Sequence, residues 1–139
     1  MEVNEPQVSY GYTDDSTVIS IMAMIRSGVK YNHFNKIAQK IPFSISEWSS
    51  FLHISERTLQ RYQAENKTFE PIQSEKIAQL TMLSNYGAEV FGSSTSFFTW
   101  LNSKSIALGG ETPKSFLDNS FGIDYIKNEL GRIQHGVLA

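Results

Sequence analysis

Along most of this chain the apolar positions recur every three or four residues, which is the period of an amphipathic α-helix. The segment that runs from residue 120 almost to the chain end shows this best, with apolar positions spaced 3, 4, 3 and 4 at Ile123, Ile126, Leu130, Ile133 and Val137. Comparable stripes predict helices over residues 16–27, 31–41, 45–52, 56–65, 74–91, 94–101 and 113–117. No segment shows the convincing apolar–polar alternation of a half-buried strand. We therefore expect an all-α protein, a helical bundle of about seven or eight helices.

Local signals set some of the expected helix boundaries. Ser44 and Glu47 have the spacing of a capping box, so a helix is predicted to begin after Ser44. Residues 68–73 are predicted to form a link, because they contain Pro71. Gly131 lies inside the last predicted helix, at a cost of about 1 kcal/mol relative to alanine. A close approach of another backbone would explain this glycine, and so would chance.

Composition bounds the class of protein. The chain has 139 residues, of which 40% are hydrophobic and 19% charged, as in a folded domain or two small helical modules that share a core. It has no cysteine, which fits a reducing cytoplasm. No apolar run approaches the roughly 20 residues of a membrane span, and the first residues lack the features of a signal peptide. We expect a cytoplasmic protein with no membrane contact.

The charge is distributed unevenly and suggests a division of the chain. Residues 1–15 carry four acids and no base, and lack periodicity, so a flexible tail is expected there. Residues 16–67 carry seven Lys or Arg and three Glu, a net charge of +4 (7 − 3). Residues 68–139 carry five bases and seven acids, a net charge of −2 (5 − 7). A contact with nucleic acid is therefore expected in the middle segment, although an ordinary solvated surface explains so small an excess equally well.

A short helix, a tight turn at His53 and Ile54, and a second helix make residues 44–63 a candidate helix-turn-helix, which would place the second helix in the major groove of DNA. Arg and Gln side chains can read base edges, and hydroxyl and N–H groups at a helix start can hold phosphate. The candidate DNA-binding residues are Ser55, Arg57, Thr58, Gln60 and Arg61. Glu56 and Glu65 on the same helix predict that DNA binding is weak. The alternative to DNA binding is that these residues form an ordinary solvated helix face.

The sequence gives little support for catalysis or metal binding. It contains no nucleophile elbow, P-loop or dinucleotide fingerprint, so we expect no enzyme activity and no cofactor. His33, His53 and His135 lack the spacing of metal ligands, and no metal site is expected. His33 and His53 are expected to be surface residues or hydrogen-bonded core residues. His135 falls in the last helical turn, where a cation suits the helix dipole.

Aromatic residues are numerous, with nine Phe, six Tyr and two Trp, and most are expected in the core. Phe97, Phe98 and Trp100 lie too close together in the sequence for all three to face one interior. One of them is therefore expected to line an interface.

Two sequence blocks resemble the Xre/MbcA/ParS-type antitoxin family. The first is Ile54-Ser55-Glu56-Arg57-Thr58-Leu59-Gln60-Arg61, which is similar to the recognition-helix segment of that family. The second begins with Trp100-Leu101, continues through Ala107-Leu108-Gly109-Gly110-Glu111-Thr112-Pro113 and Gly122, and ends with Leu130-Gly131-Arg132-Ile133-Gln134-His135-Gly136. The blocks occur in the order of the family, and the second is long and specific. Tyr62 departs from the pattern, because a further basic residue is common there.

The resemblance implies an Xre-like helix-turn-helix half over residues 16–67 and a C-terminal toxin-binding module within residues 68–139. It implies a type II antitoxin that occludes the active site of a RES-domain, NAD-directed toxin and represses its own operon by binding promoter DNA. It further implies a homodimer and mixed toxin–antitoxin oligomers. Carried onto this chain, the toxin-binding residues are Leu108, Gly109, Gly110, Thr112, Pro113, Leu130, Arg132, Ile133, His135, Gly136 and Val137.

The alternative interpretation is a helix-turn-helix transcriptional regulator whose C-terminal helix serves only dimerisation. A structural homologue with no toxin partner is a third. A neighbouring gene of toxin size would favour the first interpretation over the other two.

Overall fold

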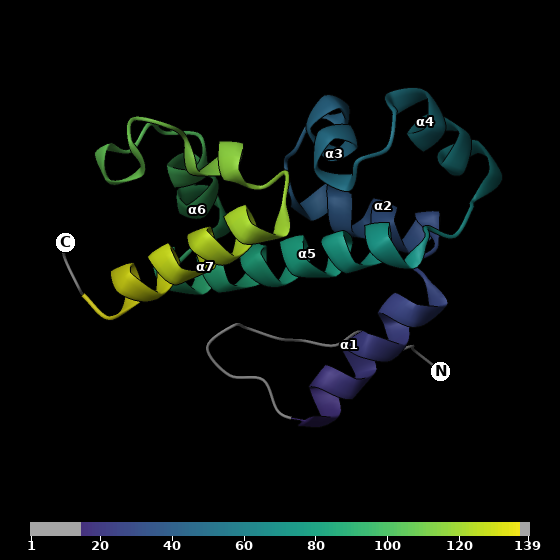
Figure 1. Ribbon diagram of the computed structural model, residues 1–139, viewed down its shortest axis with the longest axis horizontal. Helices are drawn as coiled ribbons and strands as arrows, with labels where there is room; N and C mark the ends of the chain where they lie inside the picture. Colours follow the sequence, from purple (N-terminus) through teal and green to yellow (C-terminus); the bar gives the residue numbers. More distant parts are fainter. Residues whose placement is uncertain (1–14, 137–139) are drawn as a thin grey trace.

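The computed structural model describes residues 15–136, which form seven α-helices and two short 3-10 helices (Figure 1). No strand occurs among these residues, so the predicted all-α class is confirmed. The helices are α1 (Asp15–Ser27), α2 (Tyr31–Lys40), α3 (Ile45–Leu52), α4 (Glu56–Glu65), α5 (Pro71–Phe91), α6 (Ser94–Leu101), η1 (Ile106–Leu108), η2 (Pro113–Phe116) and α7 (Ser120–Gln134).

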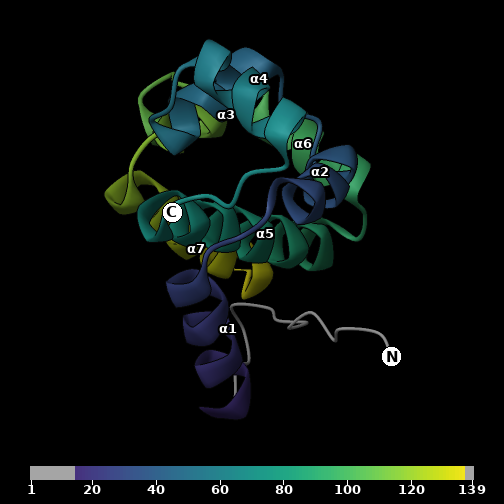
Figure 2. The ribbon, with the colours of Figure 1, turned by 90° about the vertical axis from the view of Figure 1, so that its right-hand side faces the viewer.

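Helix α5 is the longest element and packs against α1, α3, α6 and α7. Helices α5 and α7 lie side by side and run in the same direction (Figures 1 and 2). Near their starts the Lys76 ammonium donates to Ser120 Oγ at 3.0 Å, and near their ends the Tyr86 hydroxyl donates to Gln134 Oε1 at 2.7 Å. A parallel pair needs a return connection, which α6, η1 and η2 supply. Buried side chains of both helices belong to one hydrophobic core: Ile77, Leu80, Leu83, Ile123, Ile126 and Leu130.

Helices α2, α3 and α4 gather at the end of the molecule where α5 begins (Figure 1). Their core is aromatic: the Phe34 ring contacts the Trp48 ring edge-on at 5.0 Å and the Phe69 ring at 5.2 Å between centroids. Backbone contacts tie the end of α1 to the start of α5, because Phe69 N–H donates to the Val29 carbonyl and Val29 N–H donates to the buried Ser74 hydroxyl. These contacts explain why residues 28–30 and 68–74 lie together although they are distant in sequence.

The start of α5 differs from the prediction. The sequence was expected to form a link over residues 68–73, but the helix begins at Pro71. Proline suits this first helical position because the N–H that it lacks would have no partner inside the helix there. Phe69, which precedes the helix, is 1% exposed, so the link is an ordered part of the core.

The aromatic cluster of α6 also differs in part. Phe97 is fully buried, while Phe98 and Trp100 are half-buried and pack against the same core. The Phe97 ring lies 5.3 Å from the Phe98 ring and 6.2 Å from the Trp100 ring. Three neighbouring aromatic residues can contact one core because α6 lies across α5, whose Gly87 leaves room for the Phe97 ring.

Within residues 15–136, no helix is both long enough and apolar enough to cross a membrane.

Candidate functional site

The predicted helix-turn-helix is formed by α3, the turn at His53 and Ile54, and α4. The Ser44 hydroxyl accepts from Glu47 N–H at 3.0 Å and Glu47 Oε1 accepts from Ser44 N–H at 2.9 Å, which confirms the capping box. His53 ends α3 in the left-handed conformation, with φ 55°. Ser55 then caps α4 by accepting from Thr58 N–H at 3.0 Å. These local contacts define where α3 ends and α4 begins.

The structure places the predicted DNA-binding residues on one exposed part of α4. Arg57 and Arg61 are exposed and one helical turn apart, and Gln60 is exposed beside them. Ser55 and Thr58 lie at the start of the helix, where the Ser55 hydroxyl donates to Thr58 Oγ1 at 2.8 Å. Four of the five residues are therefore exposed, and Thr58 is half-buried.

Tyr62, the departure from the family pattern, does not belong to this face. Its ring is half-buried and lies 5.1 Å from the Phe69 ring, with the Lys67 ammonium 5.7 Å above it. Tyr62 therefore packs between α4 and the segment before α5. Because Tyr62 lies outside the exposed face of α4, its departure from the family pattern does not affect the positions of Arg57 and Arg61.

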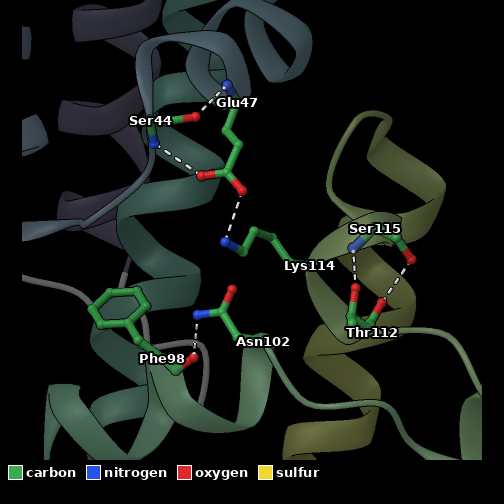
Figure 3. Close-up of polar contacts among 7 residues, drawn as sticks. All are labelled: Ser44, Glu47, Phe98, Asn102, Thr112, Lys114 and Ser115. Carbon is green, nitrogen blue, oxygen red and sulfur yellow. Dashed lines mark hydrogen bonds and ion pairs between the residues drawn. The ribbon is translucent and has the colours of Figure 1, made fainter.

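The second group of predicted residues begins in the loop before η2. Gly109 and Gly110 are exposed and have positive φ values of 69° and 83°. No atom lies within 4 Å of where a Cβ would be at either glycine, so the backbone conformation, and not lack of space, requires glycine here. Thr112 caps η2 by accepting from Ser115 N–H at 3.3 Å (Figure 3).

Leu108, Pro113 and Leu130 are buried, and Leu130 is fully so. These three predicted toxin-binding residues therefore contact the interior of their own chain. These three residues support the exposed members of the predicted set from the interior, and they are not themselves accessible to a partner. Periodicity alone placed Leu130 on the inner face of its helix, but the resemblance gave no distinction between supporting and exposed positions.

The end of α7 presents further exposed members of the set. Ile133 is 39% exposed, and Arg132, His135 and Gly136 are exposed. The Arg132 guanidinium donates to Glu129 Oε1 at 2.7 Å, one turn earlier on the same helix. The helix ends at Gln134, because His135 is its C-cap and Gly136 has a positive φ of 68°, so the predicted helical continuation through residues 135 and 136 is wrong. Val137 itself lies outside the described residues.

The two glycines of α7 have different roles. A Cβ at Gly122 would lie 1.7 Å from the Phe116 carbonyl oxygen, so the close approach of η2 to α7 requires glycine there. At Gly131 the nearest atom would be the Tyr86 hydroxyl oxygen at 3.6 Å, which is an ordinary contact. Close backbone approach therefore explains Gly122 but not Gly131.

Further apolar residues of this part of the chain were missed by the sequence interpretation. Ile106 at the start of η1 is 98% exposed, and Phe121 in the first turn of α7 is 92% exposed. Tyr125, one turn after Phe121, is 41% exposed and its ring stacks on the Phe116 ring at 5.6 Å. The helical period could have identified Phe121 and Tyr125, because they lie four residues apart and away from the stripe of Ile123, Ile126 and Leu130.

Two contacts join the helix-turn-helix to the segment that runs from η2 to the start of α7. The Lys114 ammonium lies 2.7 Å from Glu47 Oε2, which links η2 to the start of α3 (Figure 3). His53 Nε2 lies 2.6 Å from the Asp118 carbonyl oxygen, to which an N–H on that nitrogen donates. Burial raises the pKa of Glu47, but the hydrogen bonds from Lys114 and Ser44 outweigh this effect and hold the pKa below its ordinary value.

A hollow of about 680 Å³ lies between the end of α2 and α6, and it is lined by residues outside both predicted groups, among them Lys40, Phe98 and Asn102. No group of three or more His, Cys, Asp or Glu side chains within residues 15–136 is placed to hold a metal ion. The exposed predicted residues lie on α4, in the loop at Gly109 and Gly110, and at the end of α7, where a large partner could reach them.

Comparison with known proteins gives two family matches. Residues 20–81 match the antitoxin Xre-like helix-turn-helix domain, and residues 87–136 match the antitoxin Xre/MbcA/ParS C-terminal toxin-binding domain. The first match contains α2, α3 and α4, and the second contains α6, the glycine loop and α7.

Two curated proteins named Antitoxin Xre are similar to the chain. The protein of Yersinia enterocolitica serotype O:8 is 29% identical over 87 residues, which are 62% of this chain and 59% of that protein. The protein of Photorhabdus laumondii subsp. laumondii is 25% identical over 118 residues, which are 84% of this chain and 80% of that protein. The chain thus spans about three fifths of the Yersinia protein. With both domains matched in the family's order, it belongs to the Xre/MbcA/ParS family of antitoxins.

Proposed function

We propose that this protein is the antitoxin of a type II toxin–antitoxin system and neutralises its toxin by direct binding. The observation that carries the proposal is the match of residues 87–136 to a toxin-binding domain. The same residues include exposed large apolar side chains on η1 and α7: Ile106, Phe121 and Ile133. Burial of such side chains against a partner would stabilise a complex.

The surface that we assign to the toxin has two parts. One is the loop with Gly109 and Gly110, and the other is the end of α7 with Ile133, His135 and Gly136. Arg132 borders the second part, and Val137 follows it in the chain. Leu108, Pro113 and Leu130 hold these parts in place from the interior, and Thr112 does so by capping η2.

The toxin that we propose is a RES-domain protein that acts on NAD, the class implied by the resemblance of the C-terminal block. Neutralisation would be steric: the end of α7 covers the mouth of the toxin's active site and keeps substrate out. Arg132 and His135 can meet acidic groups or occupy a phosphate-binding position there. This mechanism needs no reactive group on the antitoxin.

We also propose that α4 binds the promoter DNA of the protein's own operon. Arg57, Gln60 and Arg61 are exposed on α4, within the match to the helix-turn-helix domain. Arg57 and Arg61 can contact phosphate or guanine, and Gln60 can contact adenine. Glu56 and Glu65 are exposed on the same helix and would weaken the electrostatic attraction.

The neutralisation proposal can be tested with the full chain and the toxin-sized protein encoded beside it. We expect the two to co-purify and the antitoxin to stop the loss of NAD. Ile133→Glu should weaken binding at least about tenfold, because it places a charge in a desolvated contact. Ile72→Glu is the matched control: Ile72 is 70% exposed on the first turn of α5, outside the toxin-binding match.

Two outcomes would contradict the proposal. One is that the protein encoded beside this one does not bind the chain and does not consume NAD when the chain is absent. The other is an Ile133→Glu variant that neutralises the toxin fully. If Ile133→Glu instead abolished dimerisation with no effect on a toxin, the regulator whose C-terminal helix only dimerises would be the better interpretation.

A further inference from the structure

The hollow of about 680 Å³ between the end of α2 and α6 has walls from both matched domains. Gln39, Lys40 and Pro42 lie within the helix-turn-helix match, and the wall on the α6 side lies within the toxin-binding match. None of the residues that we assign to DNA or to the toxin lines it. Its volume falls within the range of about 300–1,000 Å³ that is usual for small-molecule sites. The hollow is therefore a candidate site for a small molecule, separate from both macromolecular surfaces.

Both walls of the hollow are anchored in the core. The wall on the α6 side consists of two adjacent rows in which side chains are four residues apart: Ser94, Phe98 and Asn102, and Thr95, Thr99 and Ser103. Helix α6 is held in place because the fully buried Phe97 ring occupies the space that Gly87 leaves on α5. On the other wall, Ile41 is 3% exposed and anchors the end of α2. The hollow is thus formed before any ligand binds.

Several polar groups around the hollow have no partner within residues 15–136. The Lys40 ammonium forms no ion pair there, and the Gln39 amide and the Thr95 hydroxyl form no hydrogen bond. The Asn102 amide nitrogen donates to the Phe98 carbonyl at 2.8 Å, which leaves Asn102 Oδ1 free (Figure 3). These groups supply several hydrogen-bond donors and at least two acceptors to a molecule in the hollow.

The charge of the lining indicates what kind of molecule fits. Among the described residues that line the hollow, Lys40 is the only charged one, and none carries a carboxylate. An ammonium without a neighbouring acid attracts an anion, and phosphate oxygens are strong acceptors for it. Amide groups such as those of Gln39 and Asn102 can exchange hydrogen bonds with hydroxyl groups. The half-buried Phe98 ring adds an apolar surface against which the face of a sugar ring can pack.

We propose that this hollow binds a phosphorylated sugar, with the phosphate group at Lys40 and the sugar hydroxyls at Gln39 and Asn102. A ligand in this position contacts α2 in one matched domain and α6 in the other, so it restrains the two relative to each other. Because it binds the folded chain, it also raises the stability of the protein in proportion to its concentration. This inference does not depend on the toxin or on DNA binding.

Titration of the full chain with glucose 6-phosphate or ribose 5-phosphate tests the chemistry. We expect at least one of them to bind with a Kd on the order of 0.1–1 mM, as suits an open hollow with a single cation. In nuclear magnetic resonance spectra the amide signals that shift should be those of residues 39–42 and 94–103. Glucose, ribose and inorganic phosphate should each bind at least about tenfold more weakly, because each makes only part of the contacts.

The role of Lys40 has a matched control on the same helix. Lys40→Gln should weaken binding of the phosphorylated sugar at least about tenfold, because it removes a charge-assisted hydrogen bond. Lys36→Gln should leave binding unchanged, since Lys36 is exposed one turn earlier on α2 and does not line the hollow. The two variants lose the same charge, so a difference between them reports position and not net charge.

The place of binding has its own test. Thr99→Trp puts an indole ring into the hollow and should abolish binding, whereas Ser96→Trp, on the same helix but outside the hollow, should not. Both positions are exposed, so neither replacement disturbs the core. Circular dichroism would confirm that both variants keep their helix content.

Four results would overturn the proposal. The first is that neither phosphorylated sugar shifts the signals of the hollow at about ten times the expected Kd. The second is that inorganic phosphate binds as tightly as the phosphorylated sugars, which would indicate an adventitious ion only. The third is an equal loss of affinity in Lys40→Gln and Lys36→Gln, and the fourth is unchanged binding in Thr99→Trp.

Discussion

Glu47 accepts from the Lys114 ammonium through one carboxylate oxygen and from the Ser44 N–H through the other, at 2.7 and 2.9 Å. One side chain thus completes the cap of α3 and joins the helix-turn-helix to η2, 67 residues later in the chain. The Lys114 ammonium also lies 5.9 Å from the centre of the Phe43 ring. A contact at the start of α3 therefore links the two matched domains.

Replacing Lys114 with Met should lower the free energy of unfolding by about 1 kcal/mol, because it leaves a partly buried carboxylate without its partner. The capping box, which needs only Ser44 and Glu47, should survive. Urea unfolding would measure the decrease. The matched control is Arg132→Met, which removes the i,i+3 pair with Glu129 and should cost no more than about 0.5 kcal/mol. Equal decreases in the two variants would contradict a linking role for Lys114.

The contribution of Glu47 should depend on pH in a defined direction. Its pKa is lower in the folded chain than its ordinary value of 4.5, so the folded state favours the ionised carboxylate. The resulting stabilisation is fully present at pH values above 4.5 and is lost as the pH falls through the lowered pKa. The difference in stability between the wild type and Lys114→Met should therefore shrink on acidification. Urea unfolding at a series of pH values would measure this, and a difference that grows on acidification would refute it.

Two glycine-to-alanine substitutions in α7 should have opposite effects on thermal stability. Gly122→Ala should destabilise by about 1–3 kcal/mol, since the new Cβ would overlap the Phe116 carbonyl and force η2 to move. Gly131→Ala has room and should stabilise by up to about 1 kcal/mol, because alanine favours the helix. Differential scanning calorimetry of both variants would measure the two changes in stability. A loss of stability in Gly131→Ala would show that this glycine has a role that its surroundings do not reveal.

DNA binding should depend on the two exposed arginines of α4. Arg57→Ala and Arg61→Ala should each weaken binding to the promoter DNA of the operon. The salt dependence of binding should become less steep by about one unit for each phosphate group that the variant no longer binds. Fluorescence anisotropy at several salt concentrations would measure both effects. Lys104→Ala is a suitable control, since Lys104 is exposed in the other domain. If all three variants bound DNA alike, α4 would not be the recognition helix.

Much of the candidate site could be predicted from local residues. The capping box at Ser44, the turn at His53 and the exposed face of Arg57 and Arg61 follow from spacing over a few residues. The sequence did not reveal which members of the toxin-binding block reach solvent. Helical periodicity placed Leu130 inward, but nothing in the sequence indicated that Leu108 is buried while Ile106 is exposed.

By itself, the sequence determined the helices and most of their ends, because helical periodicity, caps and glycine conformation act within one or two turns. It also determined the family, because motifs are read directly from residue order. The tertiary structure alone decided that α5 and α7 run parallel, that Lys114 reaches Glu47 and that a hollow lies between α2 and α6. These features depend on which surfaces meet after the chain has folded, and no local pattern of apolar and polar residues specifies that.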